Sequence, residues 1–142
     1  MSDPAALEAG DGEQVITPPL GTELAGYGFY LARRAERVLD DLRVRCVCVG
    51  HGRTWVFLIS CDLIGFAVDA ADRHRRRIAE RWGVPVGHVL LACTHTHSGP
   101  ATKTAIGLGE VDPGSVAGLP GWIDEAVEGV RLGPRPVLAA GG

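Results

Sequence analysis

The sequence of 142 residues is 46% hydrophobic and 22% charged, which is the composition of one globular domain large enough to bury a core. The net charge of −3 gives no general attraction to nucleic acid or to an anionic membrane surface. No segment has the length of a membrane span, and residues 1–14 lack the basic and apolar regions of a secretion signal. We therefore expect a cytoplasmic protein whose four cysteines are free thiols.

The first part of the chain carries few periodic signals. Residues 1–13 are small and acidic, which predicts a disordered tail and a domain that comprises residues 14–142. A short strand is expected at residues 14–17, where two prolines stop it. Residues 21–30 contain three glycines and two tyrosines, and they predict a loop that either borders a site or simply packs its rings.

Two β-rich segments follow, at residues 42–49 and 55–61. The turn at residues 50–53 between them predicts an antiparallel hairpin. The second segment is short, apolar and unbroken, as in a central strand that is buried on both faces.

The best-defined helix is expected between Asp69, which can cap it, and Gly83, which ends it. A further strand at residues 88–93 completes a strand–helix–strand unit, which favours a parallel, right-handed connection. The fold class is therefore α/β, with a mixed β-sheet and a parallel βαβ unit flanked by helices. The stripe expected to face the core of this helix consists of Val68, Ala71, Arg75, Ile78 and Trp82.

A second helix is expected after Asp112 and Pro113, which are typical of an N-cap and a first helical residue. Its apolar stripe continues to Arg131, and Pro120 is expected to kink or split it. Residues 136–140 resemble the start of another strand.

Two histidines, His95 and His97, follow the predicted strand at residues 88–93. Side chains two residues apart in an extended backbone project to the same side, so both imidazoles can converge on one metal ion. Neutral imidazole is a common zinc ligand, and strand ends carry the chemistry of open α/β sheets. The alternative is that both are loop residues hydrogen-bonded to the backbone.

Asp62 follows the strand at residues 55–61. Because the carboxyl ends of parallel strands meet at one edge of a sheet, Asp62, His95 and His97 are expected at the same edge. The carboxylate at this edge either ligates the metal or orients an imidazole. Its alternative role is to cap backbone amides where the chain approaches the helix.

The segment Thr94-His95-Thr96-His97-Ser98-Gly99-Pro100 resembles the signature of the neutral/alkaline non-lysosomal ceramidase family, which consists of zinc-dependent amide hydrolases. Blocks that resemble the same family occur in order along residues 15 to 140. They are Ile16–Gly21, Ala25–Gly28, Arg33–Glu36, Asp41–Arg45 and Ser60–Leu63.

This resemblance implies a zinc cofactor and a small-molecule or lipid amide as substrate. It implies that His95 binds the metal and that His97 contacts the reacting part of the substrate, and it leaves Asp62 as the second catalytic candidate. The family's other zinc ligands, a histidine, a glutamate and a tyrosine, lie further along in longer chains. The resemblance therefore describes a truncated, amino-terminal part of a larger catalytic domain. Ala101-Thr102 departs from the two glycines that typical ceramidases have after the motif.

Three other functions fit parts of the sequence. A different metallohydrolase fold would need a further histidine and aspartate on later strands. A serine hydrolase would use Ser98, His97 and Asp62, but the Gly-x-Ser-x-Gly elbow is missing. An inactive fragment or interaction domain would instead associate with itself through an exposed sheet edge.

Two further sets of side chains have a functional and a structural interpretation. Tetrathiolate zinc would need all four cysteines to converge, whereas a cysteine in an apolar strand behaves as a small buried hydrophobe. The basic run at residues 73–77 suggests phosphate binding, but the acidic total favours a solvated helix face. The four cysteines are Cys46, Cys48, Cys61 and Cys93.

Overall fold

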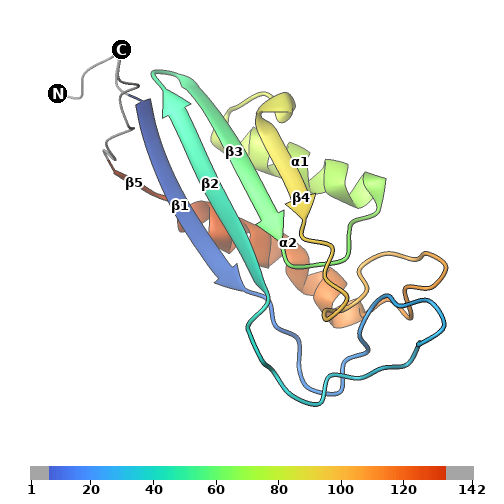
Figure 1. Cartoon of the computed structure of the whole chain (residues 1–142). Helices are drawn as coiled ribbons and strands as arrows, with labels where there is room; N and C mark the ends of the chain where they lie inside the picture. Colours follow the sequence, from blue (N-terminus) through green and yellow to red (C-terminus); the bar gives the residue numbers. More distant parts are fainter. Residues whose placement is uncertain (1–6, 134–142) are drawn as a thin grey trace, which may run out of the picture.

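In the computed structural model, which describes residues 7–133, five strands form one sheet in the order β4-β3-β2-β1-β5. Two helices lie behind this sheet, both on the same face (Figure 1). The strands are β1 (Leu7–Val15), β2 (Arg43–His51), β3 (Thr54–Cys61), β4 (Val89–Cys93) and β5 (Arg131–Gly133), and the helices are α1 (Val68–Trp82), α2 (Pro113–Glu128) and the short 3-10 helix η1 (Val86–His88).

The predicted α/β class is confirmed, since the sheet is mixed. Strands β2 and β3 form the expected antiparallel hairpin, in a register that pairs Val44 with Cys61 and His51 with Thr54. Strand β4 runs parallel to β3 after the connection through α1. The strand–helix–strand unit therefore brings the carboxyl ends of β3 and β4 together, as the sequence indicates.

One face of the sheet carries the core. Alternate side chains of β2 and β3, among them Val44, Phe57 and Ile59, are buried against the helix residues Ile78 and Ile123. The opposite face is open, and Leu58 in β3 is 42% exposed there. The expectation that β3 is buried on both faces is wrong, because both helices of the described chain cover the same side.

The predicted disordered tail is wrong over residues 7–13, which belong to β1. This strand pairs antiparallel with β2 on one side and with β5 on the other. Its Gly12 lies under the end of α2, where an added Cβ would be 2.2 Å from the carbonyl oxygen of Ala126 and 2.8 Å from the Val130 nitrogen. Glycine is therefore required for helix and strand to approach this closely, which accounts for a composition that resembles a tail.

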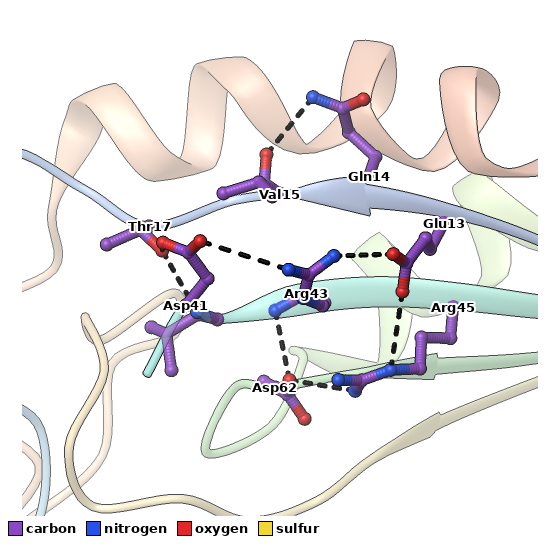
Figure 2. Close-up of polar contacts among 9 residues, drawn as sticks. Glu13, Gln14, Val15, Thr17, Asp41, Arg43, Arg45 and Asp62 are labelled. Atoms are coloured by element: carbon purple, nitrogen blue, oxygen red, sulfur yellow. Dashed lines mark hydrogen bonds and ion pairs between the residues drawn. The ribbon is translucent and has the colours of Figure 1, made fainter. Parts of the chain in front are cut away.

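Asp11 and Glu13 of β1 alternate with Gly10 and Gly12, so they lie on the open face of the sheet. Glu13 pairs with Arg43 at 2.5 Å and with Arg45 at 3.8 Å on the neighbouring strand, as Figure 2 shows. Such cross-strand ion pairs contribute a few tenths of a kcal/mol, up to about 1 kcal/mol each. A charged segment can therefore still be a strand when its partner strand carries the opposite charges.

Helix α1 differs from its prediction at one end. Gly83 ends the helix in the left-handed conformation, as expected, but the N-cap position is Ala67, and Asp69 pairs with Arg73 instead of capping. Val68 is 80% exposed, so the stripe that faces the core begins later than predicted. The buried residues of α1 are His74, Ile78 and Ala79.

The arginines of α1 are mostly engaged in contacts within the protein. Arg75 donates to the carbonyl oxygen of Val89 at 2.9 Å and also pairs with Asp72. Arg77 pairs with Asp124 of α2 at 3.0 Å, so this run joins elements of the fold as well as facing solvent. These contacts account for Arg75 and Arg77 without a phosphate ligand.

Helix α2 begins as predicted, with the Asp112 carboxylate accepting a hydrogen bond of 2.7 Å from the Ser115 amide. The helix is not split at Pro120, and the carbonyl oxygen of that proline accepts a hydrogen bond from Arg77. It ends at Glu128, three residues earlier than expected. The strand expected at residues 136–140 lies outside the described residues.

Candidate metal and catalytic site

The candidate site lies where the chain leaves β3 and β4. Parallel pairing continues past the end of β4, since the Thr94 amide donates to the carbonyl oxygen of Cys61 and the His95 amide donates to that of Leu63, both at 3.0 Å. His95 is thereby attached to the segment that follows β3. The predicted meeting of the two strand ends at one edge is therefore confirmed for the backbone.

His95 adopts an uncommon backbone conformation that fixes its ring. Its φ is +62°, in the left-handed region that residues other than glycine rarely adopt. The ring nitrogen Nδ1 lies 2.8 Å from the carbonyl oxygen of Ile64. A carbonyl oxygen only accepts, so Nδ1 carries the proton and the lone pair of the neutral ring is on Nε2. Histidines that bind metal ions usually have this arrangement.

His97 lies beside His95, with the two ring centroids 5.2 Å apart. The ring of Tyr27 packs edge-on against His97 at 4.8 Å. On another side the chain comes so close that a Cβ on Gly26, whose φ is +86°, would be 2.6 Å from the Nδ1 atom of His97. His97 is therefore partly covered by the 26–28 loop, whereas His95 is exposed.

Arg33 ties this loop to the motif. Its Nη2 atom donates to the carbonyl oxygen of His97 at 2.8 Å and to that of Ala25 at 3.2 Å. The guanidinium also lies over the Tyr27 ring, 4.6 Å from the centroid. The blocks that resemble the ceramidase family contain Arg33 and Gly26, but neither residue was assigned a role, because their partner His97 is more than 60 residues away in sequence.

Asp62 lies at the same edge of the sheet as the two histidines, but its carboxylate contacts other residues. Its Oδ2 atom accepts from the backbone amide of Arg43 at 2.9 Å and pairs with Arg45 at 3.1 Å, as Figure 2 shows. Its Oδ1 atom accepts from the Thr94 hydroxyl at 3.2 Å. Within residues 7–133, neither imidazole is hydrogen-bonded to Asp62. The carboxylate is thus joined to the motif through Thr94.

Ser98 and Thr96 line a cavity of about 490 Å³ that neither histidine lines. The Ser98 amide donates a hydrogen bond to the Thr96 Oγ1 atom at 3.1 Å. No hydrogen bond joins Ser98 to His97 in the described part of the chain. The serine-hydrolase arrangement of Ser98, His97 and Asp62 is therefore not assembled there.

The cysteines lie in an environment that disfavours thiolates. Burial, with a smaller contribution from Cys48, raises the pKa of Cys46 to about 12, and burial raises the pKa of Cys48 and of Cys93 to about 11. The pKa of Cys61 is also raised, chiefly by burial. Since the thiolate is the metal-binding form, these values favour buried hydrophobes over zinc ligands.

The donor set for a metal is incomplete among the described residues. Residues 7–133 contain no group of three or more histidine, cysteine, aspartate or glutamate side chains placed to hold a metal ion. The two adjacent imidazoles, one with its Nε2 lone pair defined, fit two positions of a zinc coordination sphere.

No protein-family model matches the sequence, and no curated protein matches it. Among solved structures, a neutral ceramidase from Pseudomonas aeruginosa is similar, with a TM-score of 0.74 over 93% of this chain at 19% identity. A ceramidase described as complexed with C2 is similar over 92% of this chain, with a TM-score of 0.73 at 20% identity. The chain spans 23% and 22% of the lengths of these proteins. It therefore shares its fold with part of a neutral ceramidase.

Proposed function

We propose that this chain contributes His95 and His97 to the zinc site of an amide hydrolase that acts on lipid amides, as a ceramidase does. The observation that carries the proposal is the hydrogen bond from His95 Nδ1 to the Ile64 carbonyl oxygen. With the proton on Nδ1, the lone pair of Nε2 can bind a metal ion at the end of the strand. The shared fold with part of a neutral ceramidase supports it. The substrate class rests on that likeness together with the motif.

A catalytic zinc ion usually has three protein ligands and one open position. His95 and His97 supply at most two, so we expect a further ligand from a segment that residues 1–142 do not include, on the same or on another polypeptide. When bound, zinc supplies Lewis-acid polarisation of the amide carbonyl and lowers the pKa of a coordinated water.

The residues of this chain then have separate tasks. His95 binds through Nε2, and its left-handed backbone and the Ile64 carbonyl oxygen set the ring orientation. His97, held between Tyr27 and Gly26, contacts the reacting part of the substrate beside the metal. Arg33 fixes the backbone on which His97 is placed.

We assign Asp62 a positioning role. Its carboxylate holds the Thr94 hydroxyl and the backbone of Arg43, and Thr94 directly precedes His95. Asp62 as a residue that touches metal or substrate stays a prediction. Its contacts indicate that Asp62 positions Thr94, the first residue of the histidine motif.

Zinc titration of the purified chain by calorimetry tests the proposal. We expect His95→Ala to lower zinc affinity by about 100-fold or more, because a ligand is lost. His97→Ala should lower it less, and His51→Ala, at the exposed hairpin turn, should leave it unchanged. Equal affinity in the wild type and His95→Ala would refute the metal site. Hydrolysis of a fluorogenic N-acyl lipid, with and without a chelator, then tests the activity.

A second candidate function is association through the open face of the sheet. Val47, Leu58 and Leu90 lie opposite one another on three adjacent strands and are all exposed. Among residues 7–133, β4 is the edge strand beside them, and an edge strand offers unpaired backbone groups to another chain. Sedimentation velocity over a range of concentrations tests this: self-association that Leu58→Lys abolishes would support it, and a monomer at all concentrations would exclude a homodimer.

A further inference from the structure

Two loops beside the candidate site expose large apolar side chains at their tips. Phe29 is 102% exposed and Ile106 is 106% exposed, so each side chain projects fully from the surface. Tyr27, Tyr30 and Leu31 flank Phe29 and are exposed as well. We call these five residues the loop-tip cluster. Exposed apolar side chains that gather in one place are typical of a surface that binds something.

The two loops are joined, so the cluster is one unit. The Gly26 amide donates to the Leu108 carbonyl oxygen at 3.1 Å, and the Gly28 amide donates to the Gly107 carbonyl oxygen at 3.2 Å. A Cβ on Gly107 would be 3.1 Å from the Cα atom of Gly28. Figure 1 shows both loops on the same side of the molecule, beyond the ends of β3 and β4. Phe29 and Ile106 therefore extend from one joined platform.

The shape of the cluster favours a lipid surface over a protein. The central residues of a protein interface pack into a complementary surface, whereas Phe29 and Ile106 are protrusions at loop tips. The hydrocarbon region of a bilayer accepts such side chains without a matching cavity. Tyrosine, with an apolar ring and a polar hydroxyl, is enriched at the membrane–water boundary. Tyr27 and Tyr30 flank Phe29, so they would lie at that boundary when Phe29 inserts.

Charge attraction does not drive this contact. The guanidinium of Arg33 is bound to two carbonyl oxygens, and Arg34 donates to the Gly21 carbonyl oxygen. Glu23 accepts from the Ala32 amide in the same region, and the chain as a whole has a net charge of −3. Arg33 and Arg34 keep their charge in these contacts, but the net charge of −3 gives the chain no overall attraction to an anionic surface, so the apolar side chains supply the affinity.

We propose that the loop-tip cluster inserts Phe29 and Ile106 into the outer layer of a zwitterionic lipid bilayer. None of the helices in residues 7–133 is long and apolar enough to cross a membrane, so this contact is peripheral. Two inserted side chains give weak, reversible binding. Because Tyr27 of the cluster packs on His97 at 4.8 Å, docking in this way brings the paired histidines to the lipid surface.

Flotation of the intact chain with phosphatidylcholine vesicles tests the proposal. We expect the wild type to bind and the double variant F29S/I106S to lose about tenfold or more in partition coefficient, since it loses both apolar side chains. The matched control V68S/L90S removes two exposed apolar side chains away from these loops and should bind as the wild type does. Binding should be insensitive to salt and to added anionic lipid.

A second variant tests insertion directly. In F29W, tryptophan fluorescence should be quenched by brominated phosphatidylcholine more than in the wild type, whose three tryptophans lie outside the cluster. Unchanged vesicle binding in F29S/I106S, binding that requires anionic lipid, or unquenched F29W would each overturn the proposal. So would a cluster-dependent oligomer without vesicle binding, which would mean a protein partner.

The docking inference does not depend on the proposed chemistry. The vesicle experiments are run in the presence of a chelator, so their result does not depend on zinc. F29S/I106S should bind zinc as the wild type does, while His95→Ala should still bind vesicles. Failure of one proposal is therefore distinguishable from failure of the other.

Discussion

The sheet and the loops around His95 and His97 each contain a glycine that another part of the chain approaches closely. The group that approaches is different in the two regions. Gly12 in β1 lies against the backbone of α2, with the Ala126 carbonyl oxygen 2.2 Å from where a Cβ would be. Gly26 lies against a side chain, the ring of His97, and also has a positive φ. A backbone neighbour cannot yield, whereas an imidazole can rotate. Substitution at Gly12 should therefore affect stability alone, whereas substitution at Gly26 should disturb the site and also lower stability through the positive φ.

The largest effect is expected for Gly12→Val. The new side chain would force α2 away from β1, and overpacking of this kind costs about 3 kcal/mol. Urea unfolding followed by circular dichroism measures the loss of free energy of unfolding. Gly87→Val is the control, because a Cβ at Gly87 has no neighbour within 4 Å. Equal stability of the two variants would show that helix and strand are not in this contact.

The same contact explains which parts of the fold were predictable. The hairpin, the Gly83 helix end and the Asp112 cap depend on residues close in sequence, so local patterns identify them. Strand β1 was missed because the reason for Gly12 is a helix more than 100 residues later. The open face of β3 was missed for a related cause: an apolar run does not say whether helices cover one side or two.

The site shows the same division. His95 and His97 were expected side by side, and their ring centroids are 5.2 Å apart. The extended backbone on which that expectation rested is wrong, because the φ of His95 is +62°. The Ile64 carbonyl oxygen that orients His95 was not, because it requires the continued pairing of the chain after β4 with the chain after β3. Asp62 was placed at the correct edge, but its direction depends on the register that brings Arg45 beside it.

The next largest effect is expected at Gly26, in the loop that contacts His97. Gly26→Ala places a side chain at a φ of +86° and against His97, and we expect a loss of about 1 to 2 kcal/mol together with weaker zinc binding. Gly28→Ala is the matched control, since Gly28 has a φ of +54° but no neighbour within 4 Å. Both variants share the backbone strain, so a difference in zinc affinity between them isolates the contact with His97. Identical zinc affinities of the two variants would show that the contact between Gly26 and His97 does not affect the site.

A smaller effect is expected at Asp62, which belongs to both regions. Its side chain is 17% exposed and joins Arg45 of the sheet to Thr94 of the motif. If it positions the motif, Asp62→Asn should lower stability by about 1 kcal/mol and change zinc affinity less than tenfold. If it binds the metal, affinity should fall by about 100-fold with little change in stability. Thr94→Val, which removes only the hydroxyl contact, shows how much of the effect passes through the motif.

The smallest effect concerns the covered face of the sheet and depends on pH. Burial, then the nearby charges of Arg77 and Arg73, lower the pKa of His74 below its ordinary value of 6.5, with Asp124 opposing them. Its Nδ1 atom has no hydrogen-bond partner among the described residues. Above about pH 8 the ring is neutral in both the folded and the unfolded chain, so it adds no pH dependence.

As the pH falls through 6.5, the unfolded chain takes up this proton first, and the native state loses stability until its own lower pKa is passed. One such group changes the free energy of unfolding by at most about 1.4 kcal/mol per pH unit. His74→Leu should therefore give a flatter profile than the wild type between pH 7 and the acid limit of folding, whereas His51→Leu, at an exposed position, should not. If the stability profiles of His74→Leu and the wild type are parallel, burial does not keep His74 neutral. The packing of α1 against the sheet would then be looser at His74 than the packing of α2 against β1 at Gly12.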